Sequence, residues 1–436
     1  MASIKGVKFH FIGIGGVGMS GLAELLHNMG ANVKGSDLST NSQTERLKGL
    51  GIEVFNTHNK EQLMPADVVV YSSAIPKTNV EYLEARKNNI PIIERAEALA
   101  EIMRSKRGIA IGGTHGKTTT TSIMGAVFIA ANKQPTIIAG GKIAQLGANA
   151  VLGDGEWLIA EADESDGSFE RLAPEVVIVT NIDNDHLEHY GSFENLKKSF
   201  FNFAMRIPFY GKAIVCGDDQ EAWDLFQDFT KPISYYGFEK RNDYVLKGSC
   251  GKYELHYKDS SLGAFEVPMP GRHNALNACA ALVAAHSAGL DIKQCFAGVA
   301  GFAGVERRFH KRGDHSGMLI YDDYAHHPTE IKTTISGFKE RFPDKKLKFV
   351  FQPHRYTRFK SCWGDFLTCF AGADELIVSD VYRAGESPLP QINSENFVHE
   401  LKSLDKKINA EFIAGKKEIF NTVSYTHLTL PTICSV

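Results

Sequence analysis

The chain has 436 residues, more than one hydrophobic core usually organises, which predicts two or three domains. Its formal net charge of -3 argues against nucleic acid or anionic lipid as a partner, and no apolar run approaches the length of a membrane span. The seven cysteines form no Cys-x-x-Cys pair, so we expect reduced thiols in a cytoplasmic protein without a signal peptide.

Short apolar strands alternate with helical segments in the N-terminal part, a pattern typical of a parallel sheet covered by helices. The expected strands are Lys8–Ile14, segments around Val33 and Val54, and Val68–Tyr71. We expect residues 1–106 to form a Rossmann-like domain of the α/β class.

A second series of the same kind predicts a central domain over 107–304. Its expected strands are Arg107–Gly112, Trp157–Glu161 and Val176–Asn181, with antiparallel hairpins between Ser234 and Met269 and a helix over Ala275–His286. A third series predicts a C-terminal Rossmann-like domain over 305–436, with strands at Met318–Tyr321, Leu347–Gln352 and Glu375–Val378.

The strongest local motif lies between a predicted strand and a predicted helix at the start of the central domain. It consists of Gly112, Gly113, Thr114, His115, Gly116, Lys117, Thr118 and Thr119. Glycines allow backbone N–H groups to converge on phosphate oxygens, a lysine adds positive charge, and a threonine can bind Mg²⁺. The loop is one residue shorter than the strict Walker pattern, and the alternative is an ordinary glycine turn capped by threonines.

Acidic runs follow two other strands of the central domain. The first is Glu161–Asp166 and the second is Asn181–His186. Carboxylate oxygens suit Mg²⁺, whereas an imidazole is an unusual addition. We expect Glu161 and His186 to serve the metal, and most of the other acids to be solvated loop residues.

A second glycine loop follows the first strand and fits G-x-G-x-x-G over Gly13–Gly18. Taken alone it predicts a dinucleotide site and an NAD-dependent oxidoreductase. A chain with a separate ATP loop more plausibly uses this one for the diphosphate of a nucleotide-linked substrate, and a purely structural turn is the third possibility. The candidate substrate residues are Gly15, Gly16, Val17, Gly18, Ser36, Asp37, Ser72, Ser73 and Ala74.

In this order, the motifs resemble the Mur ligase family over nearly the whole chain up to about Phe420. The further matching segments are Gly271–Asn277, Arg307–Phe309, Asp322–Pro328 and Gln352–Arg358. The resemblance implies a UDP-sugar domain, a central ATPase domain and a C-terminal domain that closes over the site. It also implies ATP and Mg²⁺ as cofactors and a role in peptidoglycan precursor synthesis, and thus in cell wall biogenesis, cell shape and cell division.

The resemblance also implies roles for single residues. It assigns Lys117 to the ATP phosphates, Thr118, Glu161 and His186 to Mg²⁺, Asn274 and Asn277 to the adenine end of ATP, and Arg308 and Asp323 to the nucleotide from the third domain. From the residues alone, the two asparagines are helix-start residues and Arg308 belongs to a solvated pair with Arg307.

Two segments resemble the alanine-adding branch of the family, which implies UDP-N-acetylmuramate and L-alanine as substrates. Within them, His354, Arg355 and Arg358 are candidates for binding the amino-acid carboxylate, since arginine forms bidentate hydrogen bonds with it. The alternatives are an exposed basic turn and, for His326 and His327, capping of a helix that begins with Pro328.

The implied reaction makes an acyl phosphate from the lactyl carboxylate and ATP, which the amine of L-alanine then attacks. Asp323 and His326 are both candidates for accepting the amine proton, and the sequence does not choose between them. The alternatives are a family member that attaches a recycled tripeptide to the same sugar, an oxidoreductase, and a non-catalytic nucleotide-binding regulator. We expect a monomer or a homodimer.

The final segment, 421–436, does not resemble the family. The family continues there with another strand and helix and a Gly-Ala-Gly-Asp motif, which is absent from this chain. We therefore expect an incomplete sheet in the C-terminal domain.

Overall fold

The computed structural model describes residues 4–63, 65–143, 146–315, 317–404, 408–415 and 418–419. The chain divides into two compact units. The first contains the chain as far as Pro268 together with Asn274–Val305, and the second contains Met269–His273 and the chain from Glu306 onward. The predicted atypical segment 421–436 lies outside the described residues.

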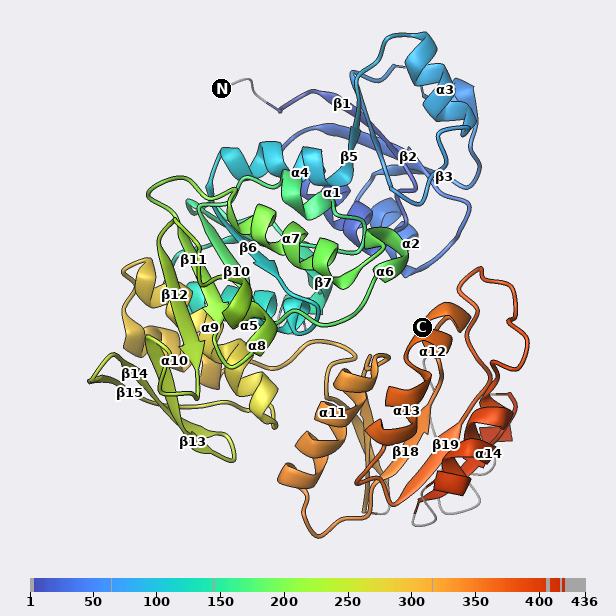
Figure 1. Ribbon diagram of the computed structural model, residues 1–436. Helices are drawn as coiled ribbons and strands as arrows, with labels where there is room; N and C mark the ends of the chain where they lie inside the picture. The colour runs from blue at the N-terminus through green and yellow to red at the C-terminus, as the bar shows by residue number, and fades with distance from the viewer. Residues whose placement is uncertain are drawn as a thin grey trace. The chain divides into compact units, whose positions relative to one another are not determined.

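The N-terminal part of the first unit is a five-stranded parallel sheet (Figure 1). Its strands, in spatial order, are β3 (Glu53–Phe55), β2 (Asn32–Ser36), β1 (Lys8–Ile12), β4 (Val68–Tyr71) and β5 (Ile92–Glu94). Its helices are α1 (Val17–Asn28), α2 (Ser42–Gly49), the 3-10 turn η1 (Lys60–Gln62), α3 (Val80–Lys87) and α4 (Arg95–Arg104). The Rossmann-like prediction is confirmed.

The middle part of the first unit is a ten-stranded mixed sheet. Its strands, in spatial order, are β15 (Ser260–Glu266), β14 (Lys252–Tyr257), β13 (Tyr244–Ser249), β12 (Ile233–Gly237), β11 (Lys212–Cys216), β10 (Val176–Val179), β6 (Arg107–Gly112), β9 (Trp157–Glu161), β7 (Thr136–Ile143) and β8 (Ala148–Val151). The strands from β13 to β7 are parallel, whereas β13–β14, β14–β15 and β7–β8 pair antiparallel.

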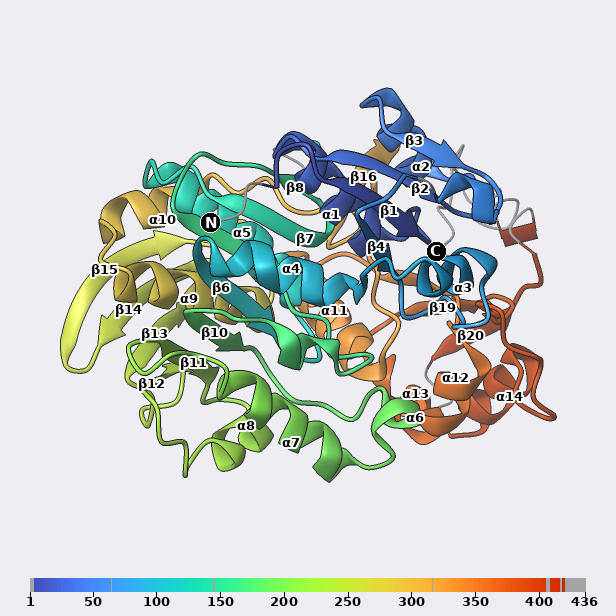
Figure 2. The ribbon, with the colours of Figure 1, turned by 90° about the horizontal axis from the view of Figure 1, so that it is seen from above.

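Helices cover both faces of the middle sheet. They are α5 (Lys117–Ala130), the 3-10 turn η2 (Ser168–Arg171), α6 (Leu187–Tyr190), α7 (Phe193–Ala204), α8 (Gln220–Leu225), α9 (Arg272–Ser287) and α10 (Ile292–Ala300). Helices α5 and α10 pack against each other on one face, and α7 and α8 lie on the other (Figure 2).

The order of the strands creates a switch point beside β6. The chain crosses from β6 to β7 on one side, while β10 and β11 follow on the other. At such a point the loops at the carboxyl ends of neighbouring strands diverge and leave a crevice in which ligands bind. The phosphate loop follows β6, and the run Asn181–His186 follows β10, so both lie at this crevice.

The two sheets of the first unit are joined by close packing of α1 on β7 and β8. Asn149 of β8 donates a hydrogen bond of 3.0 Å to the carbonyl oxygen of Val17. A Cβ atom placed on Gly21 would lie 3.2 Å from the amide nitrogen of Asn149 and 3.3 Å from Cβ of Ala150. The absence of a side chain at Gly21 therefore allows helix and hairpin to approach closely.

The second unit contains an antiparallel pair and a parallel sheet of three described strands (Figure 1). The pair is β16 (His310–His315) with β17 (Met318–Asp322), and the sheet is β18 (Lys348–Phe351), β19 (Glu375–Val378) and β20 (Asn409–Phe412). The helices are α11 (Pro328–Arg341), α12 (Tyr356–Ser361), α13 (Trp363–Cys369) and α14 (Ser394–Leu404). A core that includes Ile331, Phe351, Phe366, Leu376 and Phe397 holds strands and helices together.

The structure differs from the sequence prediction in several places. It contains β5, β11, β16 and β20, where no strand was expected. The region Ser234–Met269 begins with β12, which pairs in parallel with β11 and β13, so the hairpins comprise only β13, β14 and β15. The hairpin β7–β8 was not predicted, because Gly140 and Gly141 interrupt the alternation of β7.

Candidate functional site

The phosphate loop lies between β6 and the N-terminus of α5, as predicted. Gly113 has a φ of 135°, and a Cβ atom there would lie 1.9 Å from the hydroxyl oxygen of Thr180. Gly116 has a φ of 82°, and a Cβ atom there would lie 2.6 Å from Oδ1 of Asn277. Glycine is therefore required at both positions, by conformation and by space.

Polar groups at the end of β10 fix this loop. Asn181 accepts a hydrogen bond from the His115 backbone N–H at 2.8 Å and donates one to the His115 carbonyl oxygen at 3.0 Å. The Thr180 hydroxyl donates to the same carbonyl at 2.6 Å. The His115 ring is 3.0 Å from Asp183, whose backbone N–H donates to the Thr114 hydroxyl at 2.9 Å. The loop is thus held open as a rigid cradle.

Lys117 begins α5, and its ammonium group points back over the loop. Nζ donates to the carbonyl oxygens of Gly113 at 2.7 Å and Thr114 at 3.1 Å, and to Oε1 of Glu164 at 2.7 Å. Burial by itself would lower the pKa of Lys117, but attraction by Glu164, Glu161 and Asp163 outweighs it and raises the pKa above its ordinary value. The ammonium is therefore charged at neutral pH and placed where phosphate oxygens would enter the loop.

Glu161 and Thr118 meet at the end of β9. The Thr118 hydroxyl donates to Oε2 of Glu161 at 2.9 Å, and the same oxygen accepts the Gly140 backbone N–H at 2.6 Å. A hydroxyl and a carboxylate side by side, next to a phosphate loop, form an oxygen donor set that suits Mg²⁺. The structure brings these two predicted metal ligands together.

His186 lies on the loop after β10 and has a φ of 57°. Its Nε2 lies 3.9 Å from Oε1 of Glu164 and 3.7 Å from Oδ2 of Asp185. The third predicted metal ligand therefore faces the same acidic group that binds Lys117.

Asn274 and Asn277 are buried inside α9 and do not cap it. The Thr120 hydroxyl donates to Oδ1 of Asn277 at 3.1 Å, and Asn277 in turn lies 3.5 Å from Asn274. The pair supports the first turn of α5 beneath Gly116. Contact with adenine remains a prediction for these two residues.

Hydrogen bonds within the N-terminal sheet domain fix the glycine loop and the residues around it. Oδ2 of Asp37 accepts the Gly15 backbone N–H at 2.8 Å. Ser36 is fully buried, and its hydroxyl donates to Glu81 at 2.5 Å, so a ligand would reach it only after that bond is broken. Ser72 packs beside Gly13, and the exposed residues Ser73 and Ala74 follow it at the carboxyl edge.

In the second unit, Asp323 organises the backbone around it. Its oxygens accept the N–H groups of Phe309 at 2.7 Å and Ala325 at 2.8 Å. Burial raises the pKa of Asp323 despite the opposing charge of Arg308. Arg308 itself lies 3.9 Å from Glu330 and above the ring of Tyr324. Asp323 is thus engaged in fixing the loop before α11.

His326 and the basic segment at α12 lie together in the second unit. The rings of His326 and His354 are 5.8 Å apart, and Arg358 lies 3.3 Å from Nδ1 of His354. Arg355 stands at the N-terminus of α12 with a φ of 69°. His327 caps α11, as the alternative interpretation predicted, whereas His326 does not.

The ring of His326 is oriented by its own backbone. Nδ1 lies 2.8 Å from the carbonyl oxygen of Tyr324, which leaves the lone pair of the neutral ring on Nε2. Burial lowers the pKa of His326 to about 4, which Glu330 opposes and Arg358 reinforces. The imidazole is therefore neutral at pH 7.

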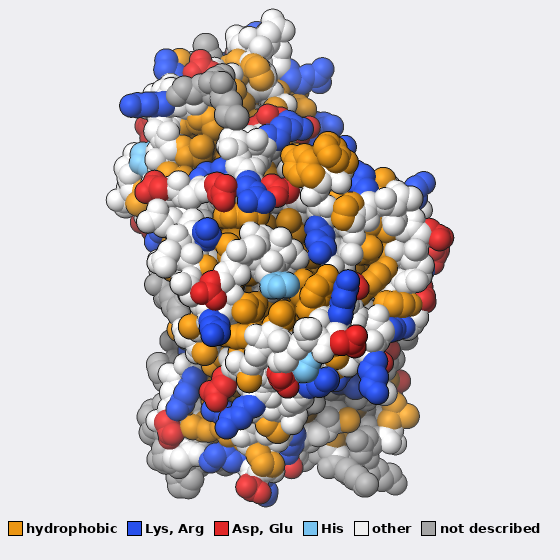
Figure 3. Space-filling view, turned by 90° about the vertical axis from the view of Figure 1, so that its left-hand side faces the viewer, with side chains coloured by type: hydrophobic (Ala, Val, Ile, Leu, Met, Phe, Trp, Pro, Cys, Tyr) orange, Lys and Arg blue, Asp and Glu red, His pale blue; other side chains and the backbone are white. Residues whose placement is uncertain are grey.

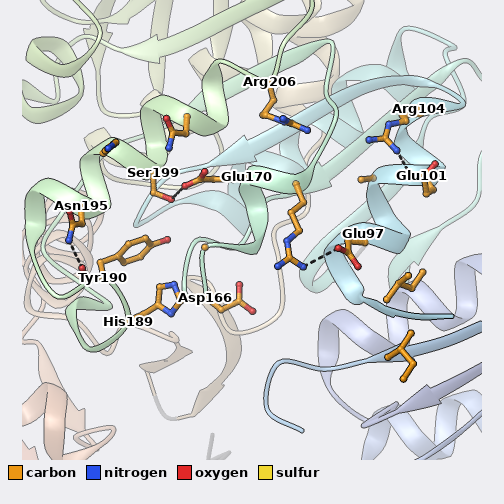
Figure 4. Close-up of a pocket in the computed structure, with 17 residues that line it drawn as sticks. Glu97, Glu101, Arg104, Asp166, Glu170, His189, Tyr190, Asn195, Ser199 and Arg206 are labelled. Carbon is orange, nitrogen blue, oxygen red and sulfur yellow. Dashed lines mark hydrogen bonds and ion pairs between the residues drawn. The ribbon is translucent and has the colours of Figure 1, made fainter. Parts of the chain in front are cut away.

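A cavity of about 1020 Å³ lies between α4 and the segment from Asp166 to Arg206 (Figure 4). Asp166, His189 and Tyr190 line one end of it, on the same loops as Glu164 and His186. Lys117 does not line the cavity. Two acidic residues of the cavity wall already have partners: Glu97 pairs with Arg171, and Glu170 accepts a hydrogen bond from Ser199. The cavity therefore shares two loops with Glu164 and His186, but no residue of the phosphate loop lines it.

Charge is evenly mixed on the molecular face in Figure 3, where Lys and Arg side chains alternate with Asp and Glu. An extended basic surface of the kind that follows a nucleic-acid backbone is absent among the described residues visible there. No helix among the described residues is both long and apolar enough to cross a bilayer.

Sequence reasoning missed three residues of the site. Asn181 and Asp183 were counted among loop residues, and Glu164 was one acid in a run, yet they fix the loop and bind Lys117. The available signal was their position directly after buried strands at the carboxyl edge of the sheet.

Domain models of one family match the chain in order. The Mur ligase catalytic domain matches residues 8–107, the Mur ligase middle domain 111–285, and the glutamate ligase domain of Mur ligases 307–427. The third match ends inside the segment predicted to be atypical.

Individual relatives match over most of their length. The chain is 53% identical to a UDP-N-acetylmuramate–L-alanine ligase from Bdellovibrio bacteriovorus over 405 residues, which are 92% of this chain and 89% of the relative. It is 44% identical to the enzyme of the same name from Trichlorobacter lovleyi, over 94% of this chain and 91% of the relative.

Solved structures share the fold. A UDP-N-acetylmuramate–alanine ligase from Thermotoga maritima superposes with a TM-score of 0.80 at 29% identity, covering 95% of this chain and 92% of that one. A murein peptide ligase from Psychrobacter arcticus has a TM-score of 0.72 at 22% identity, with 97% and 93% covered, which bears on the fold alone. With its motifs, its folds and its relatives in agreement, the chain belongs to the Mur ligase family.

Proposed function

We propose that this protein joins L-alanine to the lactyl carboxylate of UDP-N-acetylmuramate at the expense of ATP, an early step of peptidoglycan precursor synthesis. The observation that carries the proposal is the rigid phosphate loop with Lys117 at the switch point of the middle sheet, in a chain 53% identical to an enzyme of that name. The six described cysteines are free thiols, which agrees with the reducing cytoplasm where we place the reaction.

The loop supports transfer of a phosphoryl group to the carboxylate. Lys117 and the N–H groups at the start of α5 supply positive potential for the phosphate oxygens, so their contribution is positioning and charge neutralisation. The product acyl phosphate has a good leaving group, which the carboxylate lacks. The amine then attacks the acyl carbon, and the tetrahedral intermediate collapses to the amide and phosphate.

Thr118, Glu161 and His186 are the residues we assign to Mg²⁺. The short contact between Thr118 and Glu161 and the oxygen character of both groups support this assignment. When bound, Mg²⁺ would neutralise charge on the phosphates.

On the amino-acid side, we assign the carboxylate of L-alanine to Arg355 and Arg358, next to His354 and His326. The clustering of these side chains in one unit supports the assignment. Asp323 and His326 both stay candidates for accepting the amine proton: both oxygens of Asp323 accept backbone N–H groups, whereas Nε2 of His326 carries a lone pair.

A phosphate-release assay tests the proposal. Purified protein is given ATP, Mg²⁺ and UDP-N-acetylmuramate, with either L-alanine or the tripeptide L-alanyl-γ-D-glutamyl-meso-diaminopimelate as acceptor. We expect turnover with L-alanine and little with the tripeptide. A preference for the tripeptide would replace the proposed acceptor, and the absence of phosphate release with either would contradict the proposed activity.

A further inference from the structure

The side chain of Lys117 is already satisfied before any phosphate is present. An ammonium group has three donors. Those of Lys117 lie within hydrogen-bond distance of the Gly113 carbonyl, the Thr114 carbonyl and Glu164. A phosphate oxygen that binds this lysine must therefore replace one of the present partners.

Of the three partners of Lys117, only Glu164 is negatively charged, as a phosphate group is. Its side chain is 1% exposed and that of Lys117 14%. Oε1 lies 2.7 Å from Nζ, and a phosphate oxygen on the same ammonium would stand within a few ångströms of this carboxylate. Two like charges so close repel strongly where water is excluded. The backbone carbonyls carry no net charge and have no such conflict with a phosphate.

The second oxygen of Glu164 shows how far this side chain depends on Lys117. Oε2 is buried and has no hydrogen-bond partner among the described residues.

Two other groups lie close to Glu164. The Tyr190 hydroxyl donates to the backbone carbonyl of Glu164, which anchors the main chain. Nε2 of His186 lies 3.9 Å from Oε1 of the Glu164 carboxylate.

We propose that Glu164 is a positioning residue that holds Lys117 over the phosphate loop in the free enzyme and is displaced from it by the phosphates of ATP. The proposal rests on the proposed role of Lys117 in binding ATP. Glu164 directs the ammonium group of Lys117 into the loop, and it competes with the phosphates of the nucleotide for that group.

The variant Glu164→Gln tests this exchange, because it removes the charge and keeps the shape. In the full-length protein with Mg²⁺ and a non-hydrolysable ATP analogue, we expect the Kd measured by calorimetry to fall by about tenfold, the strength of one hydrogen bond to a charged group. An unchanged or weaker affinity would overturn the proposal.

Two further variants make the result specific. Glu170→Gln makes the same change in charge on η2, where the carboxylate binds Ser199, and should leave the affinity for the analogue unchanged. Glu164→Asp keeps the charge but withdraws it from Nζ, so it should tighten binding less than Glu164→Gln. If Glu170→Gln tightens binding as much, general electrostatics explains the effect and the proposal fails.

A double-mutant cycle separates this inference from the proposed function. In a Lys117→Met background, Glu164→Gln should no longer tighten binding of the analogue, because the two residues act as one pair. If tightening persists, Glu164 acts on the phosphates directly and the positioning role is wrong. If Lys117→Met alone binds the analogue as well as the unchanged protein does, the assignment of Lys117 to ATP is what fails.

Discussion

At the scale of single residues, two threonine hydroxyls on α5 differ in whether they have a hydrogen-bond partner. The Thr118 hydroxyl binds Glu161, whereas the Thr121 hydroxyl is buried without a hydrogen-bond partner among the described residues. Thr118→Val should lower kcat by at least about tenfold and raise the Mg²⁺ concentration needed for half-maximal activity. A Mg²⁺ titration of phosphate release checks this.

Thr121→Val is the matched control, on the same helix. It should leave kcat and the Mg²⁺ dependence unchanged and stabilise the protein by about 1 kcal/mol, because an unsatisfied buried hydroxyl is removed. Equal loss of activity in both variants would mean that valine disturbs α5 itself and that Thr118 has no special role.

Glu81 is a buried carboxylate with a pH-dependent contribution to stability. It lies 3.3 Å from His10 and 3.0 Å from His58, and it accepts the Ser36 hydroxyl. Burial alone would raise its pKa, but the hydrogen bonds and His10 lower the pKa below the ordinary value of 4.5. A carboxyl group with a lowered pKa stabilises the fold above its unfolded-state pKa, and this stability is lost as pH falls through the folded-state pKa.

Glu81→Gln should therefore lower the free energy of unfolding at pH 7 by about 3 kcal/mol, because the buried His10 and the half-buried His58 lose their charged partner. The difference from the unchanged protein should shrink below pH 4.5. Urea unfolding at pH 7 and at pH 4 measures both effects. Glu84→Gln, one turn along α3 and more exposed, should change little; a constant deficit across pH would contradict the linkage.

At the scale of helices and strands, the packing of α1 on the β7–β8 hairpin joins two sheets through a glycine. Gly21→Leu should destabilise the protein by about 2 kcal/mol, since the side chain would enter the space of Asn149 and Ala150. Gly49→Ala at the end of α2, where a Cβ atom meets nothing within 4 Å, should stabilise it by about 0.5 kcal/mol. Thermal unfolding distinguishes the two; equal effects would show that α1 and the hairpin adapt freely.

Local sequence patterns predicted many of the strands and helices, but they did not predict which of these elements pack against each other. Buried strands such as Val176–Val179 are recognisable because every residue is apolar, and Glu375–Val378 was located to the residue. The hairpin β7–β8 was missed because Gly140 and Gly141 interrupt the alternation of β7. Its packing against α1 was not predictable either, since it joins residues far apart in sequence, Val17 and Asn149. A periodicity argument uses only neighbours along the chain.

In the candidate site, too, local motifs were predictable and contacts between distant residues were not. The phosphate loop and Glu161 were predicted, because each follows a recognisable strand. His326 and Arg358 were named in separate segments, and their proximity was not predicted. The partner of Lys117 among several acids was not predictable, because the choice of Glu164 depends on how β9 and α5 approach each other. Ser36 was expected to face a ligand and is instead buried under Glu81, a residue of α3 that no local pattern connects to β2.

At the scale of the whole molecule, the two compact units have separate hydrophobic cores. The phosphate loop belongs to the first unit. A ligand stabilises the part of a protein that binds it, by about 2.7 kcal/mol at a concentration of 100 times Kd. ATP with Mg²⁺ should therefore raise the unfolding midpoint of the first unit more than that of the second.

The three tryptophans allow the units to be followed separately. Trp157 and Trp223 belong to the first unit and Trp363 to the second. In Trp363→Phe, fluorescence reports the first unit; in Trp157→Phe/Trp223→Phe it reports the second. We expect ATP to shift the urea midpoint of the first signal, and Lys117→Met to abolish that shift because the phosphates lose their charged partner. Equal shifts of both signals would contradict this prediction. They would mean that the nucleotide also stabilises the second unit, as a contact with Arg308 would do.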